Sequence, residues 1–308
     1  MKVLKTDHLC MLHASVNKRW ISNWFEKGMH ALFFVLGMAT VGCVVLITVY
    51  LIVSGLPAIR KIGIQEFLLG KVWASTAARP AYGILPFILT SIYGTAGAIV
   101  LGVPIGFLSA VYLAKMAPRP VKTVMESAIG LLAGIPSVVY GLVGMIVLVP
   151  AIRDAFHLAD GASLFAAMIV LAVMILPSII KVSITALKAV PKEYEEASMA
   201  LGATPIETYF RVTAPAAKSG IAAAVVLGVG RAIGEAMAVM MVAGNVANMP
   251  ALFGSVRFLT TAIASEMSYS SGLQQQALFS IGLVLFVFIM IINMILNFFL
   301  KAEKASGK

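Results

Sequence analysis

The stretch GVGRAIGEAMAVMMVAGN, from Gly228 to Asn245, consists almost entirely of small or apolar residues, yet it contains Arg231 and Glu235. Its length and composition are typical of a membrane-crossing helix, which needs about 20 mostly apolar residues. A charge at the centre of a bilayer costs roughly 2.5–3.5 kcal/mol on insertion scales. We therefore expect Arg231 and Glu235, at positions i and i+4, to share one helix face that points into a bundle or a watery path.

The composition of the whole chain supports the same conclusion. Of its 308 residues, 60% are hydrophobic and only 12% are charged, about half the charged fraction of ordinary soluble domains. This excludes a soluble protein and predicts an all-α integral membrane protein, built as one helical bundle. The net charge of +10 is better explained by basic cytoplasmic loops than by nucleic-acid binding.

Six apolar runs are long enough to span a bilayer. The third contains GIPSVVYGLVG, in which Gly134 and Pro136 are expected to bend or break the helix. Glycines spaced four apart are expected to let helices approach closely, as at Gly102/Gly106, Gly130/Gly134 and Gly230/Gly234. The six runs are roughly His30–Ser54, Ile84–Ala114, Ser127–Val149, Ala162–Ile180, Ser219–Gly244 and Gln276–Leu300.

Loop charges predict the orientation. With both termini in the cytoplasm, most Lys and Arg residues fall in cytoplasmic segments, as is usual for membrane proteins. We expect cytoplasmic ends at 1–29 and 301–308, a membrane domain over 30–300, a cytoplasmic loop at 188–218 and an outer loop at 56–83. The outer loop is unusually basic for its side and is long enough to form a small folded cap. The outer segments hold only Arg60, Lys61, Lys71, Arg79, Arg153 and Arg257.

The loop over residues 188–218 has the pattern of two short helices rather than of a plain linker. Pro191 suits a first helical position, and Gly202 suits the end of that helix. The sequence TPIE then forms a capping box, with Thr204 as the N-cap and Glu207 at the third helical position. We predict helices over about 191–201 and 205–213, with a sharp turn at Gly202.

On these patterns alone, the loop is either an amphipathic surface element without a partner or a docking element. Its residues EEASMALGATPIETYFRVTAPAA, 195–217, resemble the EAA loop of ABC-importer permeases, although Ser198 replaces an alanine of that motif. In that family the loop docks into a groove of a separate ATPase subunit. The resemblance implies that Glu196, Ala197, Gly202 and Ala203 couple this chain to an ATPase. Matches to the motif occur at Glu196, Ala197, Gly202, Ala203, Phe210, Val212 and Pro215.

Three further stretches resemble the permeases of phosphate importers: Tyr82–Pro118, Gly134–Leu142 and Gly230–Asn245. The last of these, together with the basic loop before Tyr82, is more similar to PstC-type subunits than to their PstA-type partners. The resemblance implies a type I ABC importer permease fold with six transmembrane helices in the bacterial plasma membrane. It also implies three partners: a PstA-like second permease, a cytoplasmic ATPase dimer and an extracytoplasmic phosphate-binding protein.

Two interpretations of Arg231 and Glu235 stay open. The two residues form a structural ion pair that pins helices together, or they lie on a polar path for an anion. The resemblance favours the path, where Arg231 would supply a fixed charge and a fork of donors that suits a tetrahedral oxyanion, and Glu235 would tune it. Ser137 and Tyr140 either offer hydroxyls to that anion, beside the helix start near Pro136, or serve only in packing.

No pattern for catalysis is present. The sequence lacks the G-x-x-x-x-G-K-[ST] nucleotide loop, its histidines are scattered, and Cys10 and Cys43 are not expected to form a disulfide. We expect no cofactor, no metal and no catalytic residue, with ATP hydrolysed by a separate subunit. The alternatives are a permease for sulfate or molybdate, a membrane anchor or signalling subunit, and an ion-coupled secondary transporter, although the inverted repeats typical of the last are not seen.

Overall fold

The computed structural model describes residues 4–306, without the side chains of residues 4–25, 296, 297 and 299–306. The chain forms two units, one up to Val53 and one from Ser54 onward. The first unit consists of most of helix α1 (Leu4–Ile62), of which Glu26–Ile62 is long and apolar enough to cross a membrane. This agrees with the first predicted span. Cys43 is a free thiol, and the side chain of Cys10 lies outside the described residues.

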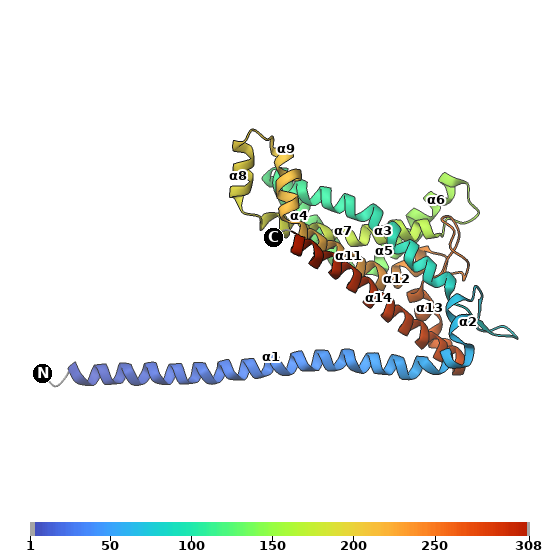
Figure 1. The fold of residues 1–308 in the computed structure, drawn as a ribbon, viewed down its shortest axis with the longest axis horizontal. Coiled ribbons are helices and arrows are strands. Elements are labelled where there is room, and N and C mark those ends of the chain that lie inside the picture. The colour runs from blue at the N-terminus through green and yellow to red at the C-terminus, as the bar shows by residue number, and fades with distance from the viewer. Residues whose placement is uncertain (1–3, 307–308) are drawn as a thin grey trace. The chain divides into compact units, whose positions relative to one another are not determined.

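The regular secondary structure of the second unit is helical apart from one short hairpin (Figure 1). Four of its helical turns are irregular: η1 (Tyr112–Met116), η2 (Gly144–Leu148) and η3 (Tyr209–Thr213) are π-helical, and η4 (Met267–Tyr269) is a 3₁₀ turn. The remaining elements are α2 (Ile64–Leu69), β1 (Trp73–Ala74), β2 (Ala81–Tyr82), α3 (Leu85–Val111), α4 (Arg119–Gly134), α5 (Ser137–Val143), α6 (Val149–Phe156), α7 (Leu164–Lys188), α8 (Lys192–Ala200), α9 (Pro205–Thr208), α10 (Ala214–Ala216), α11 (Lys218–Gly234), α12 (Met237–Val242), α13 (Leu259–Glu266) and α14 (Gly272–Ser306).

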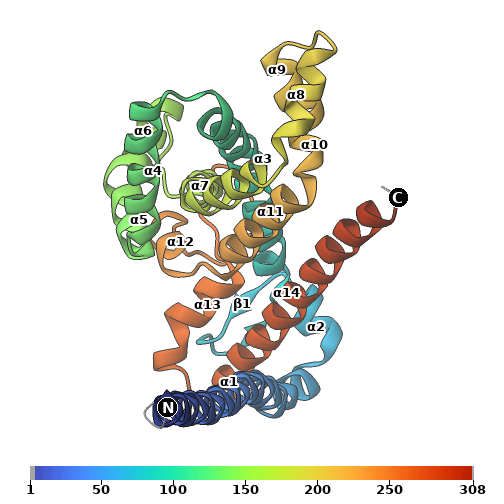
Figure 2. The same cartoon turned by 90° about the vertical axis from the view of Figure 1, so that its left-hand side faces the viewer.

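Helix α7 is the centre of this unit, with α3, α5, α11 and α12 packed around it (Figure 2). Of its most apolar window, 56% is buried, the largest share of any candidate span in the described chain. Gly102 and Gly106 of α3 lie so close to α7 that a Cβ atom at either position would come within 2.9 Å of Ile175 or Ile179. The predicted close approach is therefore confirmed for this glycine pair.

The other two glycine pairs do not make such contacts within the described residues. A Cβ atom built at Gly134, Gly230 or Gly234 would meet no described atom within 4 Å, and one at Gly130 would meet only the Lys181 ammonium at 4.0 Å. For these pairs, the prediction is wrong as far as contacts inside this chain are concerned. The face of α11 that carries Gly230 and Gly234 is open.

Within residues 4–306, five helices are long and apolar enough to cross a membrane. The count reaches the predicted six if Pro205–Ala216 and Lys218–Gly234, which are bent by 73° from each other, are taken as one crossing. We count this pair as the sixth crossing, in which α11 is the membrane-spanning part and Pro205–Ala216, set apart by the bend, continues the preceding loop. The five helices are Glu26–Ile62, Leu85–Met116, Ser137–Phe156, Leu164–Lys188 and Gly272–Ile295.

Two predicted spans need correction. The third, Ser127–Val149, is divided because α4 ends at Gly134, and the crossing runs over Ser137–Phe156 instead. Pro136 has no N–H to donate to the preceding turn, which explains the break that the sequence predicted. The fifth, Ser219–Gly244, is also divided, because Glu235 has an extended backbone, with φ −74° and ψ 128°.

The segment over residues 56–83 is folded, in agreement with the expected cap. It contains the end of α1, helix α2 and the antiparallel hairpin of β1 and β2, in which Trp73 is paired with Tyr82. Phe67, Trp73 and Tyr82 are buried in one cluster with Phe87 of α3 and Leu278 of α14. The cap is therefore anchored both on α3, which follows it directly, and on α14, which lies far from it in the sequence.

Candidate functional site

The loop between α7 and α11 forms an elbow, residues 191–213, close to the one predicted. Gly202 has φ +91°, a left-handed conformation that favours glycine. Thr204 caps α9 through a capping box with Glu207, and the hydrogen bonds from the Thr204 backbone N–H and then its side chain hold the pKa of Glu207 below its usual range. One detail differs: Pro191 has an extended ψ of 138°, so it is the N-cap of α8 rather than its first helical residue.

Three polar contacts that the sequence analysis missed hold the elbow together and in place. Glu195 of α8 forms an ion pair with Lys115 of η1, and these side chains are only 14% and 12% exposed. The hydroxyl of Thr213 also donates to Glu195 Oε1 at 3.1 Å. The hydroxyls of Ser198 and Thr208 lie 3.0 Å apart and share a hydrogen bond. The elbow is thus fixed internally and is tied to the end of α3.

The outer surface of the elbow is available to a partner. Glu196, Ala197 and Gly202 are exposed, Ala203 is half-buried, and Leu201 is 91% exposed. Figure 1 shows α8 and α9 at one end of the second unit, with α2 and α13 toward the other. Tyr194, Met199 and Ile206 of the elbow are exposed as well, so several apolar side chains are available for contact with a protein partner.

Arg231 lies in the last turn of α11 and is half-buried. Its Nη1 donates a hydrogen bond to Ser178 Oγ of α7 at 3.3 Å. Both residues border a pocket of about 490 Å³, which we call the Arg231 pocket. Sequence reasoning missed Ser178, because it lies 53 positions from Arg231 in a helix otherwise dominated by apolar residues. The pocket is lined by Ser178, Val226, Leu227, Gly230, Arg231 and Asn293.

Glu235 does not share a helix face with Arg231, which corrects the prediction. The helix ends at Gly234, and the Glu235 carboxylate turns to the next helix, where it accepts a hydrogen bond from the Ala238 N–H at 3.0 Å. The Glu235 carbonyl accepts from Thr260 Oγ1 of α13 at 2.8 Å. In the described part of the chain, no ion pair joins Arg231 to Glu235. Glu235 therefore stabilises the break and the start of α12.

Ser137 and Tyr140 lie just after the break in the third span. The Tyr140 hydroxyl donates to the Leu132 carbonyl at 2.7 Å, and this carbonyl at the end of α4 also accepts the Ile135 N–H at 3.3 Å. Tyr140 also lines an apolar pocket of about 450 Å³, and Ser137 is the half-buried first residue of α5. Neither residue lines the Arg231 pocket. Their place on an anion path thus stays a prediction, and packing is the role that the contacts favour.

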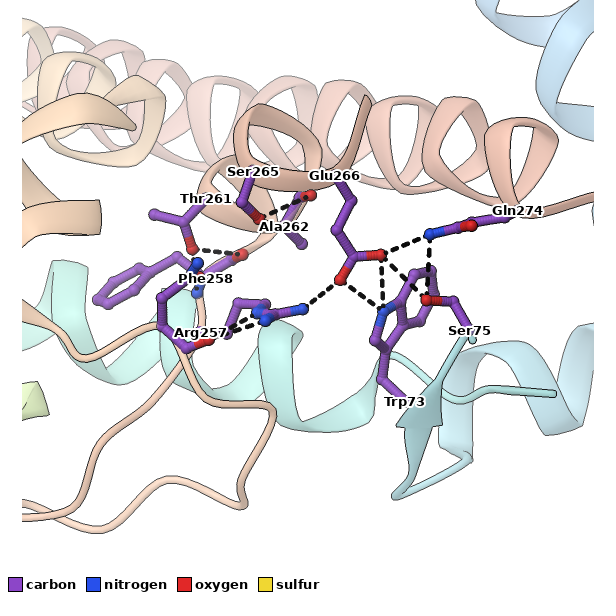
Figure 3. Close-up of polar contacts among 10 residues, drawn as sticks. Trp73, Ser75, Arg257, Phe258, Thr261, Ala262, Ser265, Glu266 and Gln274 are labelled. Carbon is purple, nitrogen blue, oxygen red and sulfur yellow. Dashed lines mark hydrogen bonds and ion pairs between the residues drawn. The ribbon is translucent and has the colours of Figure 1, made fainter. Parts of the chain in front are cut away.

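A second polar cluster lies near α13 (Figure 3), and we call it the Glu266 network. Glu266 pairs with Arg257 and accepts hydrogen bonds from the Trp73 indole, the Ser75 hydroxyl and the Gln274 amide at 3.1–3.2 Å. Arg257 also donates to the carbonyl of Asn245, which has a positive φ of 55° just after α12. The network thereby joins the β1–β2 hairpin, the α13–α14 turn and the segment that follows the broken span.

Similarity to known proteins extends over most of the chain. The profile of the family described as "Binding-protein-dependent transport system inner membrane component" matches residues 102–302. The probable ABC transporter permease protein YqgH of Bacillus subtilis (strain 168) is 42% identical, over 81% of this chain and 84% of that protein. The phosphate transport system permease protein PstC of Haemophilus influenzae is 33% identical, over 95% of this chain and 97% of that protein.

The fold has a counterpart among solved structures. A chain of the bacterial alginate ABC transporter, in complex with an alginate pentasaccharide-bound periplasmic protein, has a TM-score of 0.58 at 13% identity, covering 90% of this chain and 95% of that one. At such low identity the likeness concerns the fold alone. The fold and the relatives agree: this chain is an all-α permease of the type I ABC importer fold and belongs to the family of binding-protein-dependent transport system inner membrane components, in its PstC-type group.

Proposed function

We propose that this chain is a membrane-spanning permease subunit of an ATP-driven importer that carries inorganic phosphate across the bacterial plasma membrane. Phosphate as the substrate is supported by the PstC relative, whose name is that of a phosphate transport permease. The observation that carries the proposal is Arg231, a half-buried cation beside a partly open pocket between α7, α11 and α14. Its only hydrogen bond within the described residues is to a neutral hydroxyl, that of Ser178.

The chemistry of Arg231 suits a passing oxyanion. A guanidinium has five N–H donors in a planar fork, of which the contact to Ser178 uses one. The other donors can bind two oxygens of a tetrahedral anion side by side. Since Glu235 is engaged with α12, phosphate does not have to displace a carboxylate. The pocket is partly open, which keeps the guanidinium hydrated and the binding weak enough for release.

The elbow is proposed as the contact to the ATPase. Glu196, Ala197, Gly202 and Ala203 would lie in or beside a groove of that subunit, with Leu201 as the apolar anchor. The Lys115–Glu195 ion pair connects the elbow to η1 at the end of α3, and α3 packs along α7. A movement of the docked elbow would therefore reach the helices around Arg231 through packed and ion-paired side chains.

The remaining partners follow from the same proposal. A second, PstA-like permease would pack on the open face of α11 around Gly230 and Gly234, where small residues allow close helix contact. An extracytoplasmic phosphate-binding protein would deliver the substrate, and a dimer of ATPase subunits would hydrolyse ATP, so this chain itself is not an enzyme. Both termini and the elbow would be cytoplasmic, with the folded segment 56–83 outside.

Reconstituted uptake tests the function. The purified complex of both permeases and the ATPase is placed in proteoliposomes, with the binding protein added outside and ATP enclosed. We expect uptake of radioactive phosphate that requires every component, and little competition by sulfate or molybdate. Transport of phosphate without the ATPase would point to a secondary transporter, and stronger competition by sulfate or molybdate would point to another oxyanion.

Labelling of single cysteines tests the orientation. Cysteines are introduced at Lys71 and at Lys192 in a background without Cys10 and Cys43. A membrane-impermeant thiol reagent added to intact spheroplasts should label position 71 and not position 192. Labelling of position 71 from the cytoplasmic side alone contradicts the proposed topology.

A further inference from the structure

Asn293 is an unusual residue in its helix. The α14 window within Gly272–Ile295 has a mean hydropathy of 2.8, the highest of the candidate spans in the described chain. Between Ile281 and Ile295, Asn293 is the only polar side chain. Asn293 lines the Arg231 pocket together with residues of α7 and α11. A polar residue in such a helix is costly unless it has a partner or a function.

Helix packing does not account for Asn293. An asparagine that serves to join membrane helices donates or accepts a hydrogen bond across the interface. The Asn293 side chain has no such bond to any described residue, although α11 and α14 are packed together. Its amide group is therefore available to whatever occupies the pocket.

The three polar groups of the pocket differ in what they can offer. The Arg231 guanidinium only donates, and Ser178 Oγ already accepts a hydrogen bond from it. Asn293 brings both an N–H₂ donor and a carbonyl acceptor, Oδ1. Of these groups, Oδ1 is the one whose acceptor capacity is wholly unused, since Ser178 Oγ already uses one of its two lone pairs. A bound anion that itself carries a hydrogen-bond donor would use it.

We propose that Asn293 is a specificity-determining residue that makes the Arg231 pocket favour a protonated tetrahedral oxyanion, and this inference rests on the proposed function. At neutral pH inorganic phosphate keeps at least one P–O–H group, whereas sulfate has none. The P–O–H of phosphate donates to Asn293 Oδ1, while Arg231 and Ser178 donate to its other oxygens. Sulfate would leave Oδ1 without a partner in the bound complex, and an acceptor that loses its water without gaining a hydrogen bond disfavours that complex.

The test uses the complete importer, with its second permease, ATPase and binding protein, in lipid nanodiscs that leave both faces open to solution. Cys10 and Cys43 are replaced by serine. Leu227→Cys, at a pocket position that is 53% exposed, then reports occupancy by its rate of reaction with an anionic thiol reagent. We expect inorganic phosphate to protect this thiol at a concentration about tenfold lower than sulfate does, which is what one hydrogen bond supports.

Substitution of Asn293 then tests whether this side chain causes the difference between phosphate and sulfate. Asn293→Leu, which has the same branching at Cγ but no polar atoms, should make the two anions protect equally, whereas Asn293→Gln should keep part of the preference. Met294→Leu, at an exposed neighbouring position of α14, is the matched control and should leave the preference unchanged. If Asn293→Leu keeps the full preference, the inference is wrong. If that variant does not assemble, Asn293→Gln decides, because an undiminished preference in it also contradicts the inference.

The outcomes separate this inference from the proposed function. Equal protection by phosphate and sulfate in the unsubstituted Asn293 protein overturns the role of Asn293 and leaves Arg231 on the anion path. Protection by neither anion removes the Arg231 pocket from the path, and the proposed role of Arg231 then fails together with that of Asn293.

Discussion

Arg231 of α11 is hydrogen-bonded to Ser178 of α7, at 3.3 Å between Nη1 and Oγ. The contact joins the two helices at the pocket without neutralising the guanidinium. Glu235, which is close in sequence, instead accepts a hydrogen bond from the backbone of α12. The two charged residues of the same apolar stretch therefore have separate roles, and their substitution should have separate effects.

Replacing Arg231 by glutamine should abolish most phosphate uptake and leave assembly intact. The variant keeps a donor toward Ser178 but loses the charge, and charge-assisted hydrogen bonds contribute about 1.5–3 kcal/mol, which corresponds to roughly a 10- to 150-fold fall in uptake rate. Uptake by proteoliposomes and the yield of purified complex are measured together. Ser178→Ala, the control, removes only the neutral partner and should reduce uptake severalfold at most. Normal uptake by an assembled Arg231→Gln complex would remove Arg231 from the path.

Substitutions of Glu235 should lower the stability of the protein more than they lower phosphate uptake. Glu235→Ala removes the acceptor for the Ala238 N–H at the start of α12, and loss of such a capping bond costs about 1 kcal/mol. Glu235→Gln keeps an acceptor oxygen and should be milder in both thermal unfolding and uptake. If Glu235→Gln stops transport as completely as Arg231→Gln does, the carboxylate charge itself takes part in anion movement and the capping role is insufficient.

The Glu266 network should stabilise the cap and the segment after α12. Glu266→Gln puts an amide N–H₂ against the donors of Trp73, Ser75 and Gln274 or against Arg257. Losing one charge-assisted contact of this kind costs about 2 kcal/mol, which should lower the unfolding temperature of the purified complex. Asp154→Asn is the matched control, because its ion pair with Arg153 is exposed, at 50% and 70% for the two side chains, and should contribute under about 1 kcal/mol. Equal shifts for the two variants would show that the network adds no stability.

Local patterns explain the parts of the fold that the sequence predicted. Long apolar runs identify spans because the bilayer requires them. Pro136 ends a helix because it lacks an N–H, and Gly202 and Thr204 mark the elbow because a left-handed turn and a cap depend on residue type alone. Each of these features is decided within a few residues, so a single sequence is enough to predict it.

The parts that were missed depend on contacts between distant segments. The break at Glu235 is held by Thr260, 25 positions away, and Arg231 meets Ser178, 53 positions away. A helical pattern through Arg231 and Glu235 gives no sign of either partner. Asn293 showed no motif, and its position became informative only when α14 was seen beside the pocket. The sequence therefore predicted the charged residue of the candidate site, Arg231, but not the residues that surround it.

The Lys115–Glu195 ion pair should couple the elbow to α3. Both side chains are largely buried, so a double-mutant cycle of Lys115→Gln and Glu195→Gln should give an interaction energy of roughly 0.5–3 kcal/mol in thermal unfolding. The single variants should also raise ATP hydrolysis per phosphate imported. Lys188 and Glu126 form an exposed pair at 3.2 Å and serve as the control cycle. A cycle at Lys115 and Glu195 no larger than that of the control would show that the pair does not transmit force.

Substitution of Gly202 tests the elbow most directly. Gly202 has φ +91°, and a Cβ atom built there would meet no described atom within 4 Å. A side chain at this position is therefore disfavoured by the backbone conformation and not by a clash. Holding valine in a left-handed conformation costs about 1–2 kcal/mol, and the elbow should escape this strain by changing its turn. Gly202→Val should therefore lower ATP-driven phosphate uptake while the chain still inserts and binds the second permease.

Gly202→Asn is the control at the same position, because asparagine tolerates the left-handed region better than valine does. It should retain most of the uptake and most of the ATPase activity stimulated by the loaded binding protein. If a changed surface at position 202 were the cause, uptake should fall equally in both variants. If the left-handed turn is required, uptake by the valine variant should be well below that by the asparagine variant. Full uptake by Gly202→Val would mean that the turn is dispensable and that the elbow is not the element that couples this permease to ATP hydrolysis.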